Sequence, residues 1–167
     1  MSLIAHRAAG PTRVRCVVVT VSDTRTLDTD ASGRAIVELL SGAGHEVASR
    51  ILLRDDPRQV ASAIRSELAH PGVHAIITTG GTGLAARDST YEAVSGLFEK
   101  TVDGFGELFR MLSYADIGSA AMLSRACAGI AAGRPIFLLP GSASAVRLAM
   151  EKLILPELTH IVGELRK

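Results

Sequence analysis

Short apolar runs alternate with amphipathic segments through the first half of the chain. The runs are rich in β-branched residues, a pattern typical of buried strands, and they cover residues 14–21, 46–53 and 73–77. After the first run, apolar residues at helical spacing predict a helix that begins at Asp30 or Ser32 and is stopped by Gly42 and Gly44. After the second run, a further helix is predicted to begin at Pro57. This alternation of strand and helix predicts βαβ units and a parallel sheet.

The second half of the chain is less regular. Helices are predicted over residues 90–98, 105–113, 117–123, 142–153 and 156–165, and strands over 126–130 and 136–139. With no repeats or linkers, these elements indicate one α/β domain of three layers (αβα) over residues 13–167, with a mostly parallel, twisted, Rossmann-like sheet. Residues 1–12 lack the apolar centre of a signal peptide, and we expect them to form a flexible lead-in.

A glycine-rich loop follows the third apolar run directly. It reads Thr78-Thr79-Gly80-Gly81-Thr82-Gly83, and its glycines carry no Cβ atom to keep a ligand away from the backbone. Farther on, Ser89 and Glu92 have the spacing of a capping box that opens a helix. A strand, a bare loop and a helix N-terminus together predict a cradle for an anion, and a tight turn without a ligand is the alternative.

Polar and acidic loops follow the predicted strands and should converge, because the carboxyl ends of parallel strands meet at one edge of the sheet. These loops are Ser22-Asp23-Thr24, Arg54-Asp55-Asp56, Thr78 to Asp88 and Pro140-Gly141-Ser142. Each acidic residue could simply cap a helix: Asp88 the helix after it, and Asp55 or Asp56 the helix at Pro57. Two carboxylates beside a phosphate-sized loop favour a joint role for Asp55 and Asp88 in holding Mg²⁺.

Composition and charge exclude several classes of function. A formal net charge of +1 and the absence of Trp argue against a nucleic-acid partner, and no apolar run approaches the ~20 residues that span a bilayer. Two isolated cysteines, Cys16 and Cys127, indicate buried thiols in a reducing cytoplasm. His70 and His74 have helix-face spacing, but Pro71-Gly72 lies between them, so they predict no metal site.

Six blocks, in order along the chain, resemble the MoaB/MogA family of molybdenum cofactor biosynthesis proteins. They are Ser22-Asp23, Asp30-x-Ser32-Gly33, Thr79-Gly80-Gly81-Thr82-Gly83 with Arg87-Asp88, Gly104-Phe105-Gly106-Glu107, Leu123-Ser124-Arg125 and Leu139-Pro140-Gly141. The resemblance runs from about Val14 to Pro156 and is closer to the MoaB branch. It implies a molybdopterin-binding fold and a homotrimer or homohexamer.

The resemblance also implies a reaction, the Mg²⁺-dependent transfer of AMP from ATP to the phosphate of molybdopterin with release of pyrophosphate. The two aspartates that carry it in active members match Asp55 and Asp88, with Asp56 as the alternative to Asp55. Residues expected to bind the substrates are Ser22, Asp23, Thr79, Gly80, Gly81, Thr82, Gly83, Ser113, Pro140, Gly141 and Ser142. The competing expectation is a protein of the same pathway that binds molybdopterin or nucleotide without catalysis.

Overall fold

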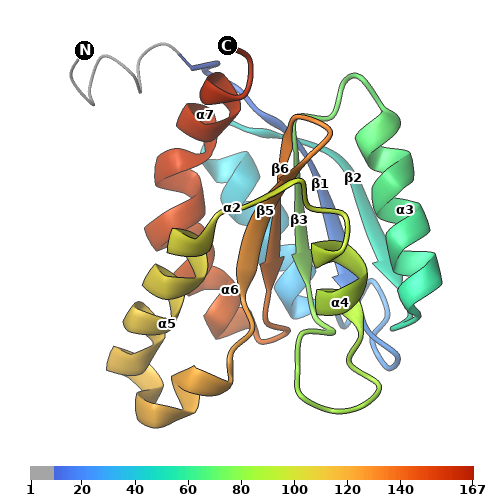
Figure 1. Cartoon of the computed structure of the whole chain (residues 1–167), viewed down its shortest axis with the longest axis vertical. Coiled ribbons are helices and arrows are strands. Elements are labelled where there is room, and N and C mark those ends of the chain that lie inside the picture. Colours follow the sequence, from blue (N-terminus) through green and yellow to red (C-terminus); the bar gives the residue numbers. More distant parts are fainter. Residues whose placement is uncertain (1–9) are drawn as a thin grey trace.

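One six-stranded sheet, in the order β2-β1-β3-β6-β5-β4, organises the chain (Figure 1). A computed structural model describes residues 10–167. The strands are β1 (Arg15–Val21), β2 (Glu46–Leu53), β3 (Ala75–Thr79), β4 (Lys100–Thr101), β5 (Cys127–Ala131) and β6 (Arg134–Leu139). The four neighbouring strands from β2 to β6 are parallel to one another. At the edge, β5 is antiparallel to β6, and β4 is antiparallel to β5. The prediction of a mostly parallel sheet is confirmed.

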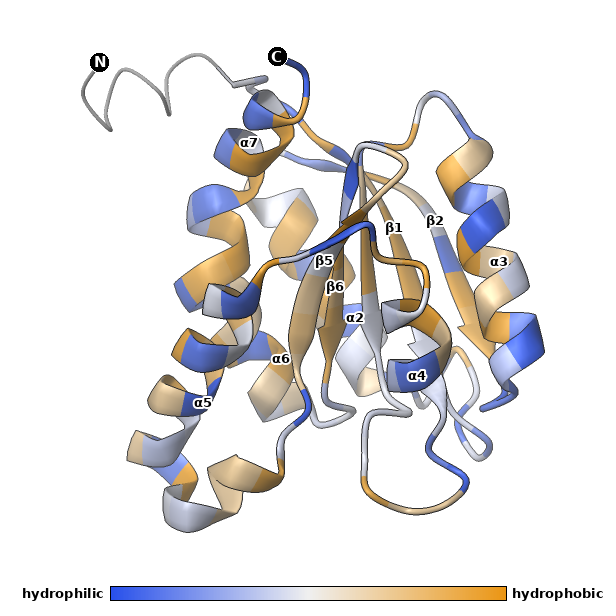
Figure 2. Ribbon diagram, viewed as in Figure 1, coloured by the Kyte–Doolittle hydropathy of each residue, from blue (hydrophilic) through white to orange (hydrophobic). Residues whose placement is uncertain are grey.

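Helices cover both faces of the sheet, as Figure 1 shows. On one face lie α2 (Ala31–Gly42), α5 (Asp103–Ile117), α6 (Ala143–Ala149) and α7 (Leu155–Glu164), and on the other lie α3 (Pro57–Ala69) and α4 (Thr90–Ser95). Successive side chains of a strand point to opposite faces of the sheet. Val18 therefore packs on the face that is covered by α2, α5, α6 and α7, and Val17 on the face that is covered by α3 and α4. The central strands β1, β3 and β6 are therefore mostly apolar and buried, while the helices carry polar residues outward (Figure 2).

Local capping explains where the first helices begin. The Asp30 side chain accepts a hydrogen bond from the Gly33 N–H at the start of α2. The Asp56 side chain accepts bonds from Arg58 and Gln59 at the start of α3, whose first residue is Pro57. These carboxylates satisfy N–H groups that the first helical turn leaves without partners. The predicted starts of both helices are confirmed.

The second half departs from the sequence prediction in four places. The two-residue strand β4 was not predicted, because both of its residues are exposed and carry no strand pattern. α4 ends at Ser95 rather than at 98, and α5 runs over Asp103–Ile117, beyond the predicted 105–113. The predicted break between residues 153 and 156 is absent, because a π-helical turn, η2 (Met150–Ile154), joins α6 to α7 and accommodates Pro156.

The predicted flexible lead-in falls mostly outside the described residues, since 1–9 are not among them. Gly10 lies against α7: a Cβ atom on Gly163 would come within 2.7 Å of the Gly10 Cα. The short 3₁₀ helix η1 (Gly118–Leu123) matches the predicted short helix over 117–123. In residues 10–167, no helix is long and apolar enough to cross a membrane.

Candidate active site

Two adjoining cavities lie at the carboxyl ends of the parallel strands. The smaller, of about 210 Å³, is lined mainly by loops after β1, β2 and β3, which supply Ser22, Asp23, Arg25, Asp55, Arg87 and Asp88. The larger, of about 450 Å³, is also bounded by α5 and η1, and its lining includes Thr82, Gly83, Ser113, Arg125, Pro140 and Ser142. Both cavities share Gly80, Gly81, Asp88 and Gly141. The structure thus brings together the loops that the sequence predicts to converge.

Asp55 and Asp56 are adjacent in sequence but have different surroundings. Asp56 caps α3 and lines neither cavity. Asp55 lines the smaller cavity, and its Oδ1 accepts hydrogen bonds from the Ser89 backbone N–H at 3.2 Å and from the Ser89 hydroxyl at 2.8 Å. The Asp55 backbone N–H in turn donates to Asp23 Oδ1 at 3.0 Å. Of the two carboxylates, only Asp55 is therefore placed to meet a ligand.

The predicted capping box at α4 is wrong. Ser89 is the N-cap residue, but its side chain makes no capping hydrogen bond because its hydroxyl donates to Asp55. Glu92 pairs instead with Arg125, whose guanidinium holds the pKa of the Glu92 carboxyl below its usual value. Both side chains that the sequence pattern assigned to the cap of α4 therefore bond residues that are distant in the sequence.

Two glycines let the loop after β3 pass close to its neighbours. Gly80 has a φ of +92°, and a Cβ atom there would collide with the Val21 carbonyl oxygen of β1. Gly81 has a φ of +68°, and a Cβ atom would lie 2.7 Å from Thr90 Cβ and 3.0 Å from Asp55 Oδ2. Side chains rarely adopt this backbone conformation, so the bare loop seen in the sequence is required by both geometry and space.

The remaining predicted site residues take supporting or lining positions. Thr79 lines neither cavity: it is fully buried at the end of β3, and its hydroxyl donates to the Pro140 carbonyl at 2.8 Å. Ser113 of α5 is buried at the wall of the larger cavity. The Ser142 hydroxyl caps α6 by accepting from the Ala145 N–H at 3.2 Å. Thr79 and Ser142 therefore hold the loop after β6 in place from its two ends.

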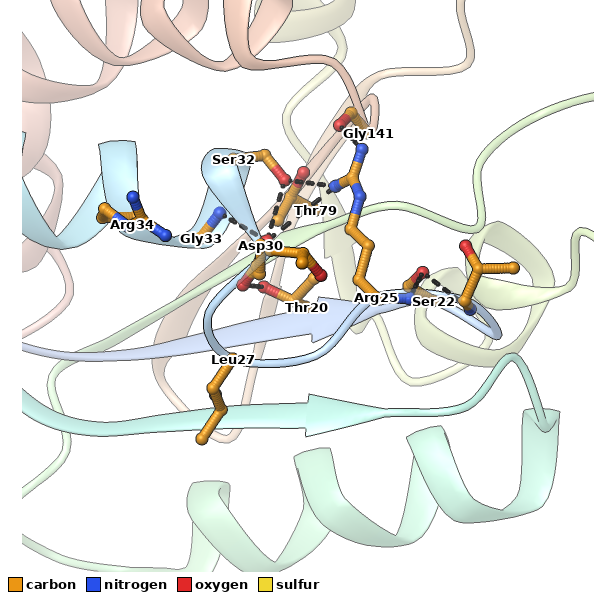
Figure 3. A network of polar contacts seen from close by, with 12 residues as sticks. Thr20, Ser22, Arg25, Leu27, Asp30, Ser32, Gly33, Arg34, Thr79 and Gly141 are labelled. Carbon is orange, nitrogen blue, oxygen red and sulfur yellow. Dashed lines mark hydrogen bonds and ion pairs between the residues drawn. The ribbon is translucent and has the colours of Figure 1, made fainter.

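A buried polar network joins the loop after β1 to the loop after β6 (Figure 3). Asp30 is fully buried and accepts hydrogen bonds from the Thr20 hydroxyl at 2.7 Å and from Arg50 at 3.0 Å. Burial by itself would raise the pKa of Asp30, but the hydrogen bonds it accepts, led by that from Thr20, hold it below its usual value of 3.8. Arg25 bonds Ser32 at 2.7 Å and the Gly141 carbonyl at 2.9 Å, so it ties the network to the cavity wall.

The donor set at the smaller cavity fits Mg²⁺. Asp55 Oδ1 carries both bonds from Ser89, and Asp88 Oδ2 accepts one from the Ala85 N–H at 3.1 Å. Asp55 Oδ2 and Asp88 Oδ1 accept no hydrogen bond within residues 10–167. Across the same residues, no group of three or more His, Cys, Asp or Glu side chains forms a metal cage. Mg²⁺ commonly takes one or two carboxylates and completes its shell with water and phosphate oxygens.

Comparison with known proteins identifies the family. The chain matches the family described as a probable molybdopterin binding domain over residues 17–160. Molybdenum cofactor biosynthesis protein B of Bacillus cereus is 51% identical over 168 aligned residues, which cover all of this chain and 99% of that protein. The chain belongs to the MoaB/MogA family. The Bacillus subtilis protein of the same name is 48% identical over the same coverage.

Solved structures of the family confirm the fold and favour the MoaB branch. A crystal structure of a molybdenum cofactor biosynthesis protein B has a TM-score of 0.91 at 53% identity, covering 93% of this chain and 98% of the other. The tungsten cofactor synthesizing protein MoaB of Pyrococcus furiosus has a TM-score of 0.85 at 37% identity, covering 94% and 99%. A MogA structure has a TM-score of 0.82 at only 26% identity, covering 90% and 99%.

Sequence reasoning missed two arginines of this MoaB-like site. Arg25 follows the Ser22-Asp23 block and reaches the Gly141 carbonyl, 116 residues away. Arg125 closes the Leu123-Ser124-Arg125 block, and its guanidinium contacts the glycine loop at the Thr82 and Gly83 carbonyls. The available signal was the position of Arg125 in a family block and of Arg25 close to one, but their partners include backbone carbonyl groups, which every residue carries.

Within residues 10–167, no histidine or cysteine lines either cavity. His74 lies just before β3, at the end of the strands opposite the cavities, and its Nδ1 accepts a bond from the Arg15 N–H at 3.0 Å. Burial raises the pKa of the Cys16 thiol to about 12 and that of Cys127 to about 11, so neither thiol is ionised near neutral pH.

Proposed function

We propose that this MoaB-like protein acts in molybdenum cofactor biosynthesis by transferring AMP from ATP to the phosphate of molybdopterin, with Mg²⁺ and release of pyrophosphate. The observation that carries the proposal is that Asp55 and Asp88 line one cavity with the backbone of Gly80 and Gly81. Each carboxylate has an oxygen atom without a protein hydrogen bond in the described part of the chain. Membership of the MoaB/MogA family supports the same reaction class.

The chain's own residues would mainly bind and orient two polyanionic substrates. Asp55 and Asp88 would hold Mg²⁺, which when bound stabilises charge on the ATP phosphates. The backbone N–H groups of the glycine loop would bind phosphate oxygens. The attacking group is a substrate phosphate whose second pKa is about 6, so no protein base is needed near neutral pH. Catalysis would rest on positioning, which alone can contribute several kcal/mol.

The larger cavity suits a flat heterocycle carried by one of the substrates. Its wall combines the apolar side chains of Phe109, Ile117 and Leu123 with the hydroxyl groups of Ser113 and Ser142. Mostly apolar walls with a few placed polar groups are typical of sites for small ligands. Because this cavity shares Asp88 with the smaller one, a ring bound here would lie next to the proposed metal and phosphate site.

The decisive experiment is a product assay with purified protein, molybdopterin, ATP and Mg²⁺, read by mass spectrometry. We expect adenylylated molybdopterin from the wild type. Asp55→Asn and Asp88→Asn should each lower the rate at least about 100-fold, because each removes a ligand of a group that stabilises the transition state by several kcal/mol. Asp56→Asn is the matched control: asparagine also caps helices, so the rate and the stability of this variant should be unchanged.

Two outcomes would contradict the proposal in different ways. Unchanged rates in both the Asp55→Asn and Asp88→Asn variants would refute the assigned roles. Tight binding of molybdopterin by a wild-type protein that forms no product would identify a binding protein of the same pathway.

We also propose that the chain forms a homo-oligomer, a trimer or a hexamer. Away from the larger cavity, α5 and the adjoining η1 expose large apolar side chains, namely Leu108, Met111, Tyr114 and Met122. Contiguous exposed apolar surface is typical of protein interfaces. Light scattering after size-exclusion chromatography gives the mass of the assembly, and a monomer at micromolar concentration would contradict the proposal.

A further inference from the structure

Arg125 holds the glycine loop from the side of β5. It lies in the segment between η1 and β5, and its side chain is 24% exposed. Its Nε atom donates to the Thr82 carbonyl at 3.0 Å, and one terminal nitrogen donates to the Gly83 carbonyl at 2.6 Å. The other terminal nitrogen bonds the Glu92 carboxylate. One planar guanidinium therefore bridges two successive peptide groups of the loop and the helix that follows it.

These contacts determine which way the peptide groups of the loop point. In a trans peptide the C=O and N–H bonds are directed oppositely, so a carbonyl bound to Arg125 turns the N–H of the next residue away from it. The Gly81 carbonyl is held in a similar way, by the Thr90 N–H at 3.0 Å. Within residues 10–167, the N–H groups of Gly83 and Leu84 donate to no acceptor. The loop thus presents backbone donors that the protein does not use.

Arg125 is itself held firmly. Its guanidinium carbon lies 4.7 Å from the centre of the Tyr91 ring, a cation–π contact, and Glu92 neutralises its charge from the same helix. Fixing a long side chain at several atoms reduces the loss of side-chain freedom that each hydrogen bond would otherwise entail. Arg125 can therefore act as a rigid support for the loop.

We propose that Arg125 is a positioning residue for phosphate recognition: by holding the carbonyls of Thr82 and Gly83, it fixes the glycine loop so that the N–H group of Gly83, which lines the larger cavity with Asp88, is oriented to bind a phosphate oxygen. This inference rests on the proposed function, because it assigns the phosphates of that reaction to this loop. Three N–H groups of Arg125 donate to protein acceptors, so it acts on the substrate through the loop that it holds.

The test compares Arg125→Ala and Arg125→Lys with a matched control, Arg134→Ala. Arg134, the first residue of β6, likewise makes three hydrogen bonds, to the carbonyls of Val73, Ala132 and His70, but it lines neither cavity. Two measurements are made on each full-length protein: backbone order parameters without ligand, and the Kd for Mg-ATP by calorimetry. The loop measurement requires no ligand, so it remains informative if the proposed reaction is wrong.

In Arg125→Ala we expect the order parameters of Gly83 and Leu84 to fall from about 0.85 to below about 0.6. The Kd for Mg-ATP should rise about tenfold or more, since the donors are no longer preorganised. Arg125→Lys should recover only part of both effects, because an ammonium group cannot match a planar fork across two carbonyls. Arg134→Ala should change neither quantity.

Three results would overturn the inference alone. They are an ordered loop in Arg125→Ala, an unchanged Kd despite a loosened loop, and an equal rise of the Kd in Arg134→Ala. A wild type that binds Mg-ATP with the expected dependence on Arg125 but forms no adenylylated product would refute the proposed reaction and leave the role of Arg125 supported. A wild type that does not bind Mg-ATP would overturn both.

Discussion

Replacing Asp30 by asparagine tests whether the buried network of Figure 3 stabilises the fold. Asp30 Oδ1 accepts bonds from the Gly33 N–H at 2.9 Å and from Ser32 at 3.2 Å, and Oδ2 accepts from Thr20 and Arg50. Asparagine keeps one acceptor oxygen but turns the other into an NH₂ group. The Thr20 hydroxyl can rotate to accept from that group, whereas a guanidinium can only donate. The variant therefore loses mainly its interaction with Arg50, together with the longer ion pair between Arg25 and Asp30 Oδ1 at 3.8 Å.

The size of the loss follows from what Arg50 retains. A hydrogen bond to a charged group contributes about 1.5–3 kcal/mol, and breaking a fully buried ion pair costs about 3–5 kcal/mol. The Arg50 side chain is 24% exposed and keeps its bonds to the carbonyls of Leu27 and Asp30, so the lower range applies. We expect Asp30→Asn to lower the free energy of unfolding by about 2.5 kcal/mol, which corresponds to a fall in Tm of about 5–10 °C for a chain of this size.

Urea and thermal unfolding followed by circular dichroism measure both quantities. Asp28→Asn is the control, because Asp28 is exposed in the same loop, and its Tm should not change. The folded pKa of Asp30 lies below its usual value of 3.8, so the stability it contributes is present above about pH 4 and is lost as the pH falls through the folded pKa. The difference in Tm between Asp30→Asn and the wild type should therefore become smaller as the pH falls below about 4. A fall in Tm of less than about 2 °C at pH 7 would refute the reasoning, since it corresponds to at most about 1 kcal/mol.

Two further predictions concern pH and backbone geometry. Burial, with neighbouring arginines, holds the pKa of His74 below its usual 6.5, so its bond from the Arg15 N–H adds stability above pH 6.5 that is lost as the pH falls through the folded pKa. The Tm of the wild type should therefore drop more than that of His74→Gln between pH 7.5 and about pH 5, and equal drops would contradict this. Gly81→Ala should cost at least about 2 kcal/mol in urea unfolding, from its positive φ and the clash with Thr90. Gly104→Ala, which meets open space in α5, should instead be neutral or stabilising, and similar losses in the two variants would refute the argument.

The first half of the fold could be predicted because its signals are local. The strand over 46–53 has the predicted bounds, and α2 and α3 begin at the predicted caps. An aspartate that accepts bonds from N–H groups two or three residues ahead needs no distant partner. In the second half, β4 pairs two exposed residues with β5, and that pairing depends on where β5 lies.

The candidate site likewise has features that the sequence could predict and features that depend on the fold. The glycine loop, its position after a strand and the convergence of loops were predictable, because they follow from residue type and from the parallel order of strands. The choice between Asp55 and Asp56 could not be predicted from the sequence. Asp56 bonds residues two and three positions away, whereas Asp55 bonds Ser89, which is 34 positions away, and so removes it from the capping box that the sequence indicated.

By itself, the sequence determined five of the six strands, most of the helix starts and the family to which the chain belongs, because burial patterns, caps and motif blocks depend on residues close together in the sequence. Only the tertiary structure decided which carboxylate faces the cavity, that Arg25 and Arg125 support its walls, and that Thr79 lies beneath it. These outcomes depend on hydrogen bonds between segments 34 to 116 residues apart. Such bonds form only where the folded backbone brings a donor and an acceptor within about 3 Å of each other.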